Sequence, residues 1–126
     1  MLNDLERIGD HDEKIAILME RQEDNSCKLD TTAIKDIQTM ADKTQGILES
    51  MKVLILNSEE DPVPKALERG RALDALRDKL RQKNLDRLVK QKAKPLPGVV
   101  FTDMLTSFEK MGDHAFNVVE ACAGIR

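Results

Sequence analysis

One stripe of residues between positions 33 and 55 restricts the fold of this chain more than any other feature. Its members return at alternating steps of four and three: Ala33, Ile37, Met40, Thr44, Ile47, Met51 and Leu54, with Ile34, Ala41, Leu48 and Ile55 beside them. This spacing places all of them on one side of an α-helix, whereas a half-buried β-strand would alternate at every second residue. A stripe of this width is typical of a helix that faces the core of a bundle.

Three further segments carry helical spacing, and short stretches of helix-breaking residues separate them. We expect these helices over about 2–23, from the turn at Pro62 to about 93, and from 99 or 100 to 123, while Asp30 and its neighbours cap the helix that carries the stripe. Long helices with short connections favour antiparallel neighbours. The sequence therefore predicts an all-α fold, an antiparallel bundle of four long helices in which each helix contacts two neighbours.

The composition fits one helical domain over residues 1–126. Charged residues make up 34% of the chain, and three Phe with no Tyr or Trp leave an aliphatic core. Cys27 and Cys122 lack metal-site or redox spacing, so they indicate a reducing environment rather than a disulfide framework. The longest apolar run, Val53 to Leu56, is far below the ~18 residues of a membrane-spanning helix, and no secretory signal is visible.

The charge of the chain is unevenly distributed. The net charge is −3, but the segment from Lys65 to Lys94 holds eleven Lys or Arg against four acidic residues. Such a segment is either a solvated basic face or a contact surface for an acidic partner, a phosphate or an anionic lipid. No aromatic residues alternate with these basic residues, so we expect no nucleic-acid binding.

A seven-residue phrase occurs twice, as LERIGDH at 5–11 and as FEKMGDH at 108–114. Each copy sets two carboxylates four residues apart, Glu6 with Asp10 and Glu109 with Asp113, and on a helix these pairs repel by a few tenths of a kcal/mol. A bound cation would relieve the repulsion, and oxygen ligands suit iron, manganese, magnesium or calcium. The alternative is neutralisation by the basic residue three positions before each Asp.

Each copy also contains a glycine and a histidine. Gly9 and Gly112 lie in the middle of expected helices, where glycine costs about 1 kcal/mol relative to alanine. We therefore expect both to mark the close approach of another part of the chain or of a bound species. His11 and His114 directly follow the Asp and are turned about 100° from it. We interpret them as surface or capping residues, with a ligand role as the alternative.

Three further aspartates are weaker candidates for metal ligands. Asp74 and Asp78 repeat the four-residue spacing, but nearby Arg71, Arg77 and Arg81 favour ion pairs there. Asp103 lies roughly 120° around its helix from Glu109.

No nucleophile motif, phosphate loop or zinc spacing occurs, and the Glu-x-x-His pairs of carboxylate-bridged metal bundles are missing from the sequence. We therefore predict no enzymatic activity. The alternatives are a carboxylate-bridged bundle for metal storage or metal-dependent catalysis, and an interaction module that binds no metal.

The two copies of the phrase, with Ala115 and Asn117 after the second, resemble the repeated signature of the PhoU family of helical proteins linked to phosphate uptake. Residues 73–77 and 98–105 resemble the PhoU-like domain at the C-terminus of bacterial sodium/phosphate cotransporter-related proteins. The resemblance implies that residues 1–24 are the end of a first three-helix repeat and that residues 28–126 form a complete second repeat.

The resemblance further implies that Glu6, Asp10, Glu109 and Asp113 are metal ligands, with iron as the associated metal. It implies a regulatory domain on the cytoplasmic face of the bacterial inner membrane, docked onto the membrane-embedded phosphate transporter domain of its own parent protein or of a partner transporter. Within this picture the basic segment around Arg77, Arg81 and Lys83 is the candidate docking face. Because the first repeat is incomplete, we also expect exposed apolar surface and a homo-oligomer.

Overall fold

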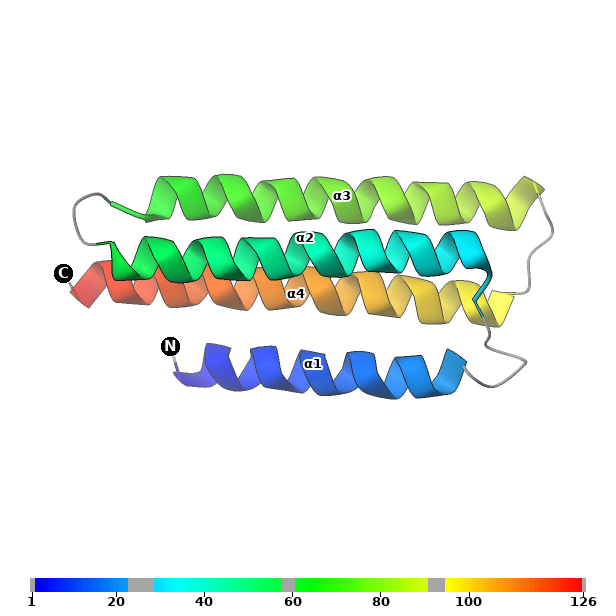
Figure 1. The fold of residues 1–126 in the computed structure, drawn as a ribbon, viewed down its shortest axis with the longest axis horizontal. Coiled ribbons are helices and arrows are strands. Elements are labelled where there is room, and N and C mark those ends of the chain that lie inside the picture. Colours follow the sequence, from blue (N-terminus) through cyan, green and yellow to red (C-terminus); the bar gives the residue numbers. More distant parts are fainter. Residues whose placement is uncertain (1, 23–28, 58–60, 91–94, 126) are drawn as a thin grey trace.

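The computed structural model describes residues 2–22, 29–57, 61–90 and 95–125. These segments form four helices, α1 (Leu2–Gln22), α2 (Thr31–Leu56), α3 (Val63–Lys90) and α4 (Pro95–Ile125), and they contain no strand. Successive helices run in opposite directions along one long axis (Figure 1). The all-α bundle predicted from the sequence is therefore confirmed.

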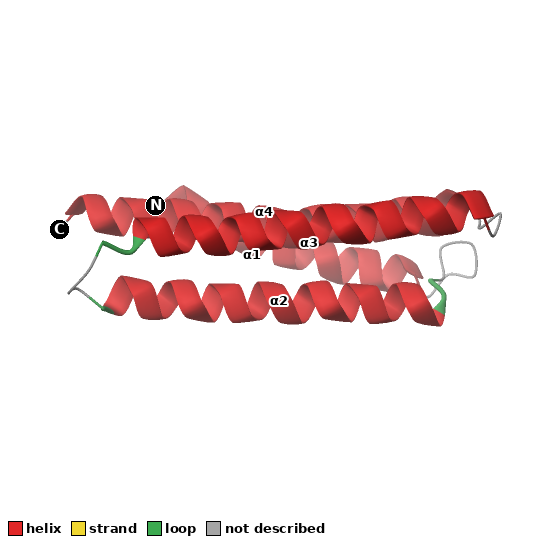
Figure 2. Cartoon of the chain, turned by 90° about the horizontal axis from the view of Figure 1, so that it is seen from above, coloured by secondary structure: helices red, strands yellow, loops and turns green. Residues whose placement is uncertain are grey.

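The four helices do not share contacts evenly. α4 packs against α1, α2 and α3, and α2 also packs against α3, whereas α1 contacts α4 alone. α1 and α3 lie on opposite sides of α4, and α2 covers a third side of it (Figures 1 and 2). The expectation of two neighbours for every helix is thus wrong for α1 and α4. Among the described residues, α4 buries eight apolar side chains, whereas α1 buries Ile15 and Leu18.

The start of α2 follows the sequence expectation. Asp30 caps the helix, because its side-chain Oδ1 accepts a hydrogen bond of 2.8 Å from the backbone N–H of Ala33. At the other end the backbone N–H of Asn57 donates to the carbonyl oxygen of Val53.

The start of α4 differs from the expectation. The helix begins at Pro95, four or five residues before the predicted start at 99 or 100. Prolines fit the first turn of a helix because the N–H groups there have no partner within the helix. The two prolines of this segment thus open α4 instead of separating it from the preceding chain.

The core runs through all four helices, since Ile15 and Leu18 of α1 belong to the same cluster as the buried residues of α2, α3 and α4, and it is almost entirely aliphatic. Its largest fully buried apolar side chains are Leu18, Met40, Met51, Leu73, Val100, Phe101, Met104, Leu105 and Val119. Phe101 is the one aromatic residue in that set. No helix in the described parts of the chain is both long and apolar enough to cross a bilayer.

Several basic side chains of α3 hold it to its neighbours. Lys83 Nζ lies 3.0 Å from Asp36 Oδ1, and Arg87 Nη2 lies 3.3 Å from Asp36 Oδ2. Arg87 also stacks over the ring of Phe101, with 5.4 Å between the guanidinium carbon and the ring centroid. Part of the positive charge of α3 therefore faces the inside of the bundle and balances the negative charge of the buried Asp36.

Candidate metal site

Three carboxylates meet where α3 passes α4. Asp74 comes from α3, and Glu109 and Asp113 come from successive turns of α4; one oxygen of each lies within 4.8 Å of the others. Among the residues that the structure describes, no other three acidic, His or Cys side chains come this close. The second copy of the repeated phrase thus supplies two of the three oxygens, and α3 supplies the third.

Gly112 explains why α3 and α4 come so close at this point. A Cβ atom at Gly112 would lie 2.5 Å from Cδ2 of Leu73, the residue that precedes Asp74. The predicted close approach is confirmed here, and a packed side chain is the neighbour. At Gly9 no atom of the described chain lies within 4 Å of the corresponding position, so the expected approach of another part of the chain is not found there.

Glu109 is the buried member of the group, with 6% of its side chain exposed. Arg77 Nη1 lies 3.2 Å from Glu109 Oε2, but the two are not aligned for a hydrogen bond, and Arg77 donates its hydrogen bonds to Asp78 Oδ1. As long as Glu109 is ionised, Glu109 Oε2 and Asp74 Oδ1 both lack a hydrogen-bond donor among the described residues. Buried oxygens without donors are costly, so both can accept a further positive partner.

The pKa of Glu109 reflects its burial and the nearness of the two other carboxylates. Burial raises the pKa of the Glu109 carboxyl to about 7; hydrogen bonding to Asp113, the negative charge of Asp113 and hydrogen bonding to Asp74 act in the same direction, while the positive charge of Arg77 opposes them. At neutral pH this carboxyl therefore holds a proton for a large part of the time. A proton or a cation is needed for the three groups to share this space.

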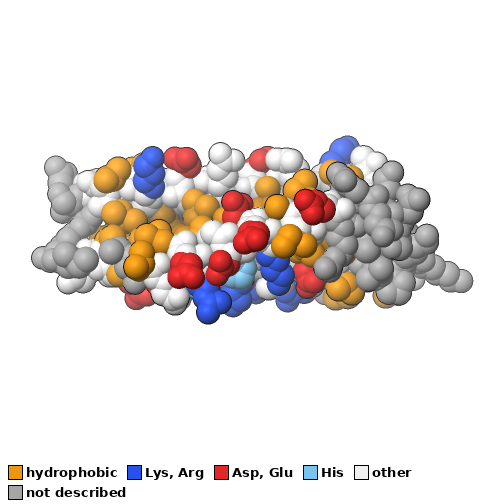
Figure 3. Space-filling model, turned by 90° about the horizontal axis from the view of Figure 1, so that it is seen from below, with side chains coloured by type: hydrophobic (Ala, Val, Ile, Leu, Met, Phe, Trp, Pro, Cys, Tyr) orange, Lys and Arg blue, Asp and Glu red, His pale blue; other side chains and the backbone are white. Residues whose placement is uncertain are grey.

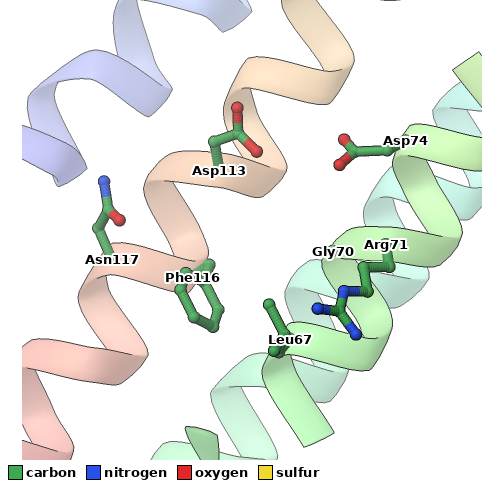
Figure 4. A pocket seen from close by; sticks show the side chains of 7 residues that line it. All are labelled: Leu67, Gly70, Arg71, Asp74, Asp113, Phe116 and Asn117. Carbon is green, nitrogen blue, oxygen red and sulfur yellow. The ribbon is translucent and has the colours of Figure 1, made fainter. Parts of the chain in front are cut away.

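The site opens to solvent on one side. Asp74 and Asp113 point toward each other across a cleft of about 170 Å³ between α3 and α4 (Figure 4). Leu67, Gly70, Arg71, Phe116 and Asn117 line the rest of the cleft. The ion pair that the sequence offered as an alternative is also present, since Lys110 Nζ lies 3.6 Å from Asp113 Oδ2. Both of its side chains are nearly half exposed, so the pair contributes little.

The first copy of the phrase has different surroundings. Glu6 and Asp10 are exposed on α1 and do not belong to the carboxylate group. The two copies meet through their histidines instead: the rings of His11 and His114 stack with centroids 5.7 Å apart. Burial lowers the pKa of His11, and the nearby His114 acts in the same direction. The histidines thus pack between α1 and α4, which corrects their interpretation as surface or capping residues.

A polar contact joins α1 to α4 beside this stack. Asp4 Oδ1 accepts a hydrogen bond of 3.0 Å from Asn117 Nδ2 and lies 3.1 Å from His114 Nδ1. The hydrogen bond from Asn117, followed by that from His114, lowers the pKa of Asp4. Sequence reasoning did not single out Asp4, because its partners come from the opposite end of the chain.

The three aspartates that were weaker candidates for metal ligands lie in different surroundings. Asp78 is exposed and pairs with Arg77 at 2.9 Å, as the arginines around it predicted. Asp103 lines a different cleft, with Leu85 and Leu88 of α3. Asp74, by contrast, belongs to the carboxylate group. No signal in the sequence favoured Asp74 over Asp78, because the packing of α3 against α4, with Leu73 next to Gly112, decides which of the two faces α4.

Fold and site together define an all-α bundle whose core helix presents a carboxylate pair to an acid on a neighbouring helix. A family model described as the PhoU domain matches residues 37–122, and the chain belongs to the PhoU family. The match includes all three carboxylates and leaves α1 outside. Searches of curated proteins and of solved structures found no match.

Proposed function

We propose that this chain is a non-enzymatic regulatory domain in phosphate homeostasis, and that it works by holding a hard cation between α3 and α4. The carboxylate group of Asp74, Glu109 and Asp113, inside the segment that matches the PhoU domain, is the observation that carries the proposal. Membership in the family supports the regulatory part, and the geometry of the three acids supports the cation.

The residues fit a hard cation. All donors are carboxylate oxygens, which suit iron, manganese, magnesium or calcium better than a soft metal. Two of these oxygens, Glu109 Oε2 and Asp74 Oδ1, lack hydrogen-bond donors, and the adjoining cleft has room for water molecules that complete a coordination shell. Iron is the metal that the family resemblance favours. A bound cation would neutralise the acids and tie α3 to α4.

We further propose that the domain docks onto the membrane-embedded domain of a sodium-dependent phosphate transporter, at the cytoplasmic face of the bacterial inner membrane. The docking face would be the outward side of α3. Arg77, Arg81 and Lys83 all contact side chains within the bundle, so Arg69, Lys79 and Lys90, which are exposed, are the better contact residues. Their reversal to Glu should abolish co-sedimentation with membranes that contain the transporter. Unchanged co-sedimentation would contradict this docking face.

Whether a cation is bound is tested by measuring the metal content by mass spectrometry. The protein is purified without chelator or metal-affinity tag. The repeated phrase supplies a matched control: Glu109→Gln/Asp113→Asn alters the clustered pair, and Glu6→Gln/Asp10→Asn alters the exposed pair. Stoichiometric iron or manganese that disappears only in the first variant supports the site. Equal loss in both variants, or equal retention, would contradict it.

One observation favours a second candidate, an interaction module that binds no metal. Arg77 already places a positive charge 3.2 Å from Glu109. A proton on Glu109 together with this guanidinium would balance part of the group without a metal. Metal-free wild-type protein that takes up none of the four cations on titration would establish this alternative.

A further inference from the structure

Arg77 brings a positive charge of the chain itself to the group of Asp74, Glu109 and Asp113. Its Nη1 lies 3.2 Å from Oε2 of the buried Glu109. While Glu109 is ionised, this oxygen accepts no hydrogen bond from the described residues, although water does not reach it. The guanidinium therefore lies next to the buried oxygen that a metal ion would use, and it does not occupy that oxygen by a hydrogen bond.

Asp78 holds Arg77 from the other side. Arg77 donates two hydrogen bonds to Asp78 Oδ1, one of 3.1 Å from Nε and one of 2.9 Å from Nη2. Asp78 is exposed and lies outside the carboxylate group. Because the guanidinium is a rigid plane, these two bonds restrict where its remaining nitrogen can lie. We therefore expect the charge of Arg77 to stay beside Glu109 when a metal ion binds.

This charge affects which ions the group can balance. When ionised, the three acids carry three negative charges, and Arg77 reduces the sum to two. A divalent ion then leaves no net charge, whereas a trivalent ion leaves one positive charge in a partly buried site. The repulsion from Arg77 is also about one and a half times as strong for a trivalent ion. Arg71 and Lys110 are exposed, so water and salt screen their charges.

We propose that Arg77 is a built-in cation of the carboxylate group, that it competes with metal ions, and that it makes the site selective for divalent over trivalent ions. This role rests on the cation of the proposed function and narrows the charge of that ion. Among hard cations it favours manganese, magnesium, calcium and ferrous iron over ferric iron. Asp78 is the positioning residue, because it fixes the place of the guanidinium.

The test compares two probe ions on the full chain, Mn²⁺ followed by electron paramagnetic resonance and Tb³⁺ followed by its luminescence. Arg77→Gln removes the charge and keeps a polar side chain. We expect it to tighten the binding of Mn²⁺ about tenfold and that of Tb³⁺ about 30-fold, because the logarithm of the gain grows with the charge of the ion. The ratio of the two gains decides, since a change in the protonation of Glu109 alters both affinities alike.

Two further variants separate Arg77 from other charges. Arg71→Gln removes an exposed charge that lines the same cleft, and it should change either affinity by less than about threefold. Asp78→Asn frees Arg77 to hydrogen-bond Glu109 and should weaken the binding of Mn²⁺. If Asp78 acts through Arg77, the same substitution should have little effect once Arg77 is Gln. Circular dichroism verifies that every variant is folded.

Weak binding elsewhere on the surface needs its own control. Acidic side chains are also visible on the side of the molecule on which α1 lies (Figure 3), and Glu6 and Asp10 are exposed there. Binding that persists in Glu109→Gln/Asp113→Asn measures this background, and it is subtracted from every titration.

No gain in Arg77→Gln, equal gains for the two ions, or an equal effect of Arg71→Gln would overturn the proposal while it leaves the cation of the proposed function in place. Wild-type protein that binds neither ion would instead remove that cation. Arg77→Gln would then decide the role of Arg77 alone. Binding that this variant acquires and that Glu109→Gln abolishes would support the role, and no binding would overturn it.

Discussion

The copy of the repeated phrase on α4 and the copy on α1 differ at three of seven positions, all by conservative changes. Yet Glu109 is buried among two other acids, while Glu6 is exposed. The difference comes from α3, which lies over the α4 copy and has no counterpart over the α1 copy in the described part of the chain. Equal local sequences thus acquire different chemistry according to the helix that covers them.

Removal of the covering side chain should have the largest effect. Leu73→Ala should lower the free energy of unfolding by about 3 kcal/mol, because Leu73 is fully buried and its loss leaves a cavity above Gly112. Leu5→Ala on the open α1 copy should change it by less than about 0.5 kcal/mol, since Leu5 is half exposed. Urea unfolding followed by circular dichroism measures both. Similar losses would mean that α1 is also covered in solution.

Because Glu109 is buried beside two other carboxylates, the free energy of unfolding should depend on pH. This dependence is measured on protein freed of metal by chelator. The pKa of Glu109 is raised in the folded state from 4.5 to about 7, so the folded protein binds more protons than the unfolded chain between these values. Stability should therefore be greatest at the acid end of this window and fall as the pH rises through it, on the order of 2 kcal/mol in total.

The two glutamate variants separate this contribution from that of other groups. Glu109→Gln should flatten the profile between pH 4.5 and 7, whereas Glu6→Gln should leave it as in the wild type. A flat profile in the wild type, or an equal change in both variants, would show that Glu109 does not titrate in this window.

The two glycines should respond to alanine with opposite signs. Gly112→Ala should destabilise the protein by about 1–2 kcal/mol, because the new Cβ requires the buried Leu73 side chain to move. Gly9→Ala should stabilise it by up to about 1 kcal/mol, because α1 gains helix propensity and has open space there. Thermal unfolding compares the two. The double variant Gly112→Ala/Leu73→Val should regain part of the loss, and simple additivity would argue against this contact.

The smallest effect concerns the attachment of α1. Because α1 has one neighbouring helix, its backbone amides should exchange with solvent faster than those of α4. Asp4→Ala removes the acceptor for Asn117 and His114 and should accelerate exchange in α1 alone. Hydrogen exchange with mass spectrometry resolves the two helices. Exchange that is equally slow in α1 and α4 would indicate a second neighbour for α1.

Much of the fold was predictable because its signals are local. The four-and-three stripe places α2 correctly, and Asp30 marks its first turn by hydrogen bonding within three residues. The start of α4 was missed by a few residues, since proline can either end a segment or open a helix. Which of the two occurs at Pro95 depends on the packing of the helix that follows.

The candidate site was predictable only in part. Repetition drew attention to Glu109 and Asp113, because two carboxylates at this spacing are unfavourable without a partner. It gave equal weight to Glu6 and Asp10, and it placed Asp74 below them. The rank of Asp74 depends on how α3 slides along α4, and that register is set by contacts between residues far apart in the sequence.

The sequence by itself determined that this chain forms long amphipathic helices and that two of them carry paired acids beside a glycine, because helical periodicity and side-chain charge are properties of neighbouring residues. Only the tertiary structure decided which glutamate is buried, which third acid joins its pair and which glycine has a leucine above it. The reason is that these outcomes depend on contacts between residues far apart in the sequence: where Leu73 packs against Gly112, α3 lies close enough for Asp74 to reach Glu109 and Asp113.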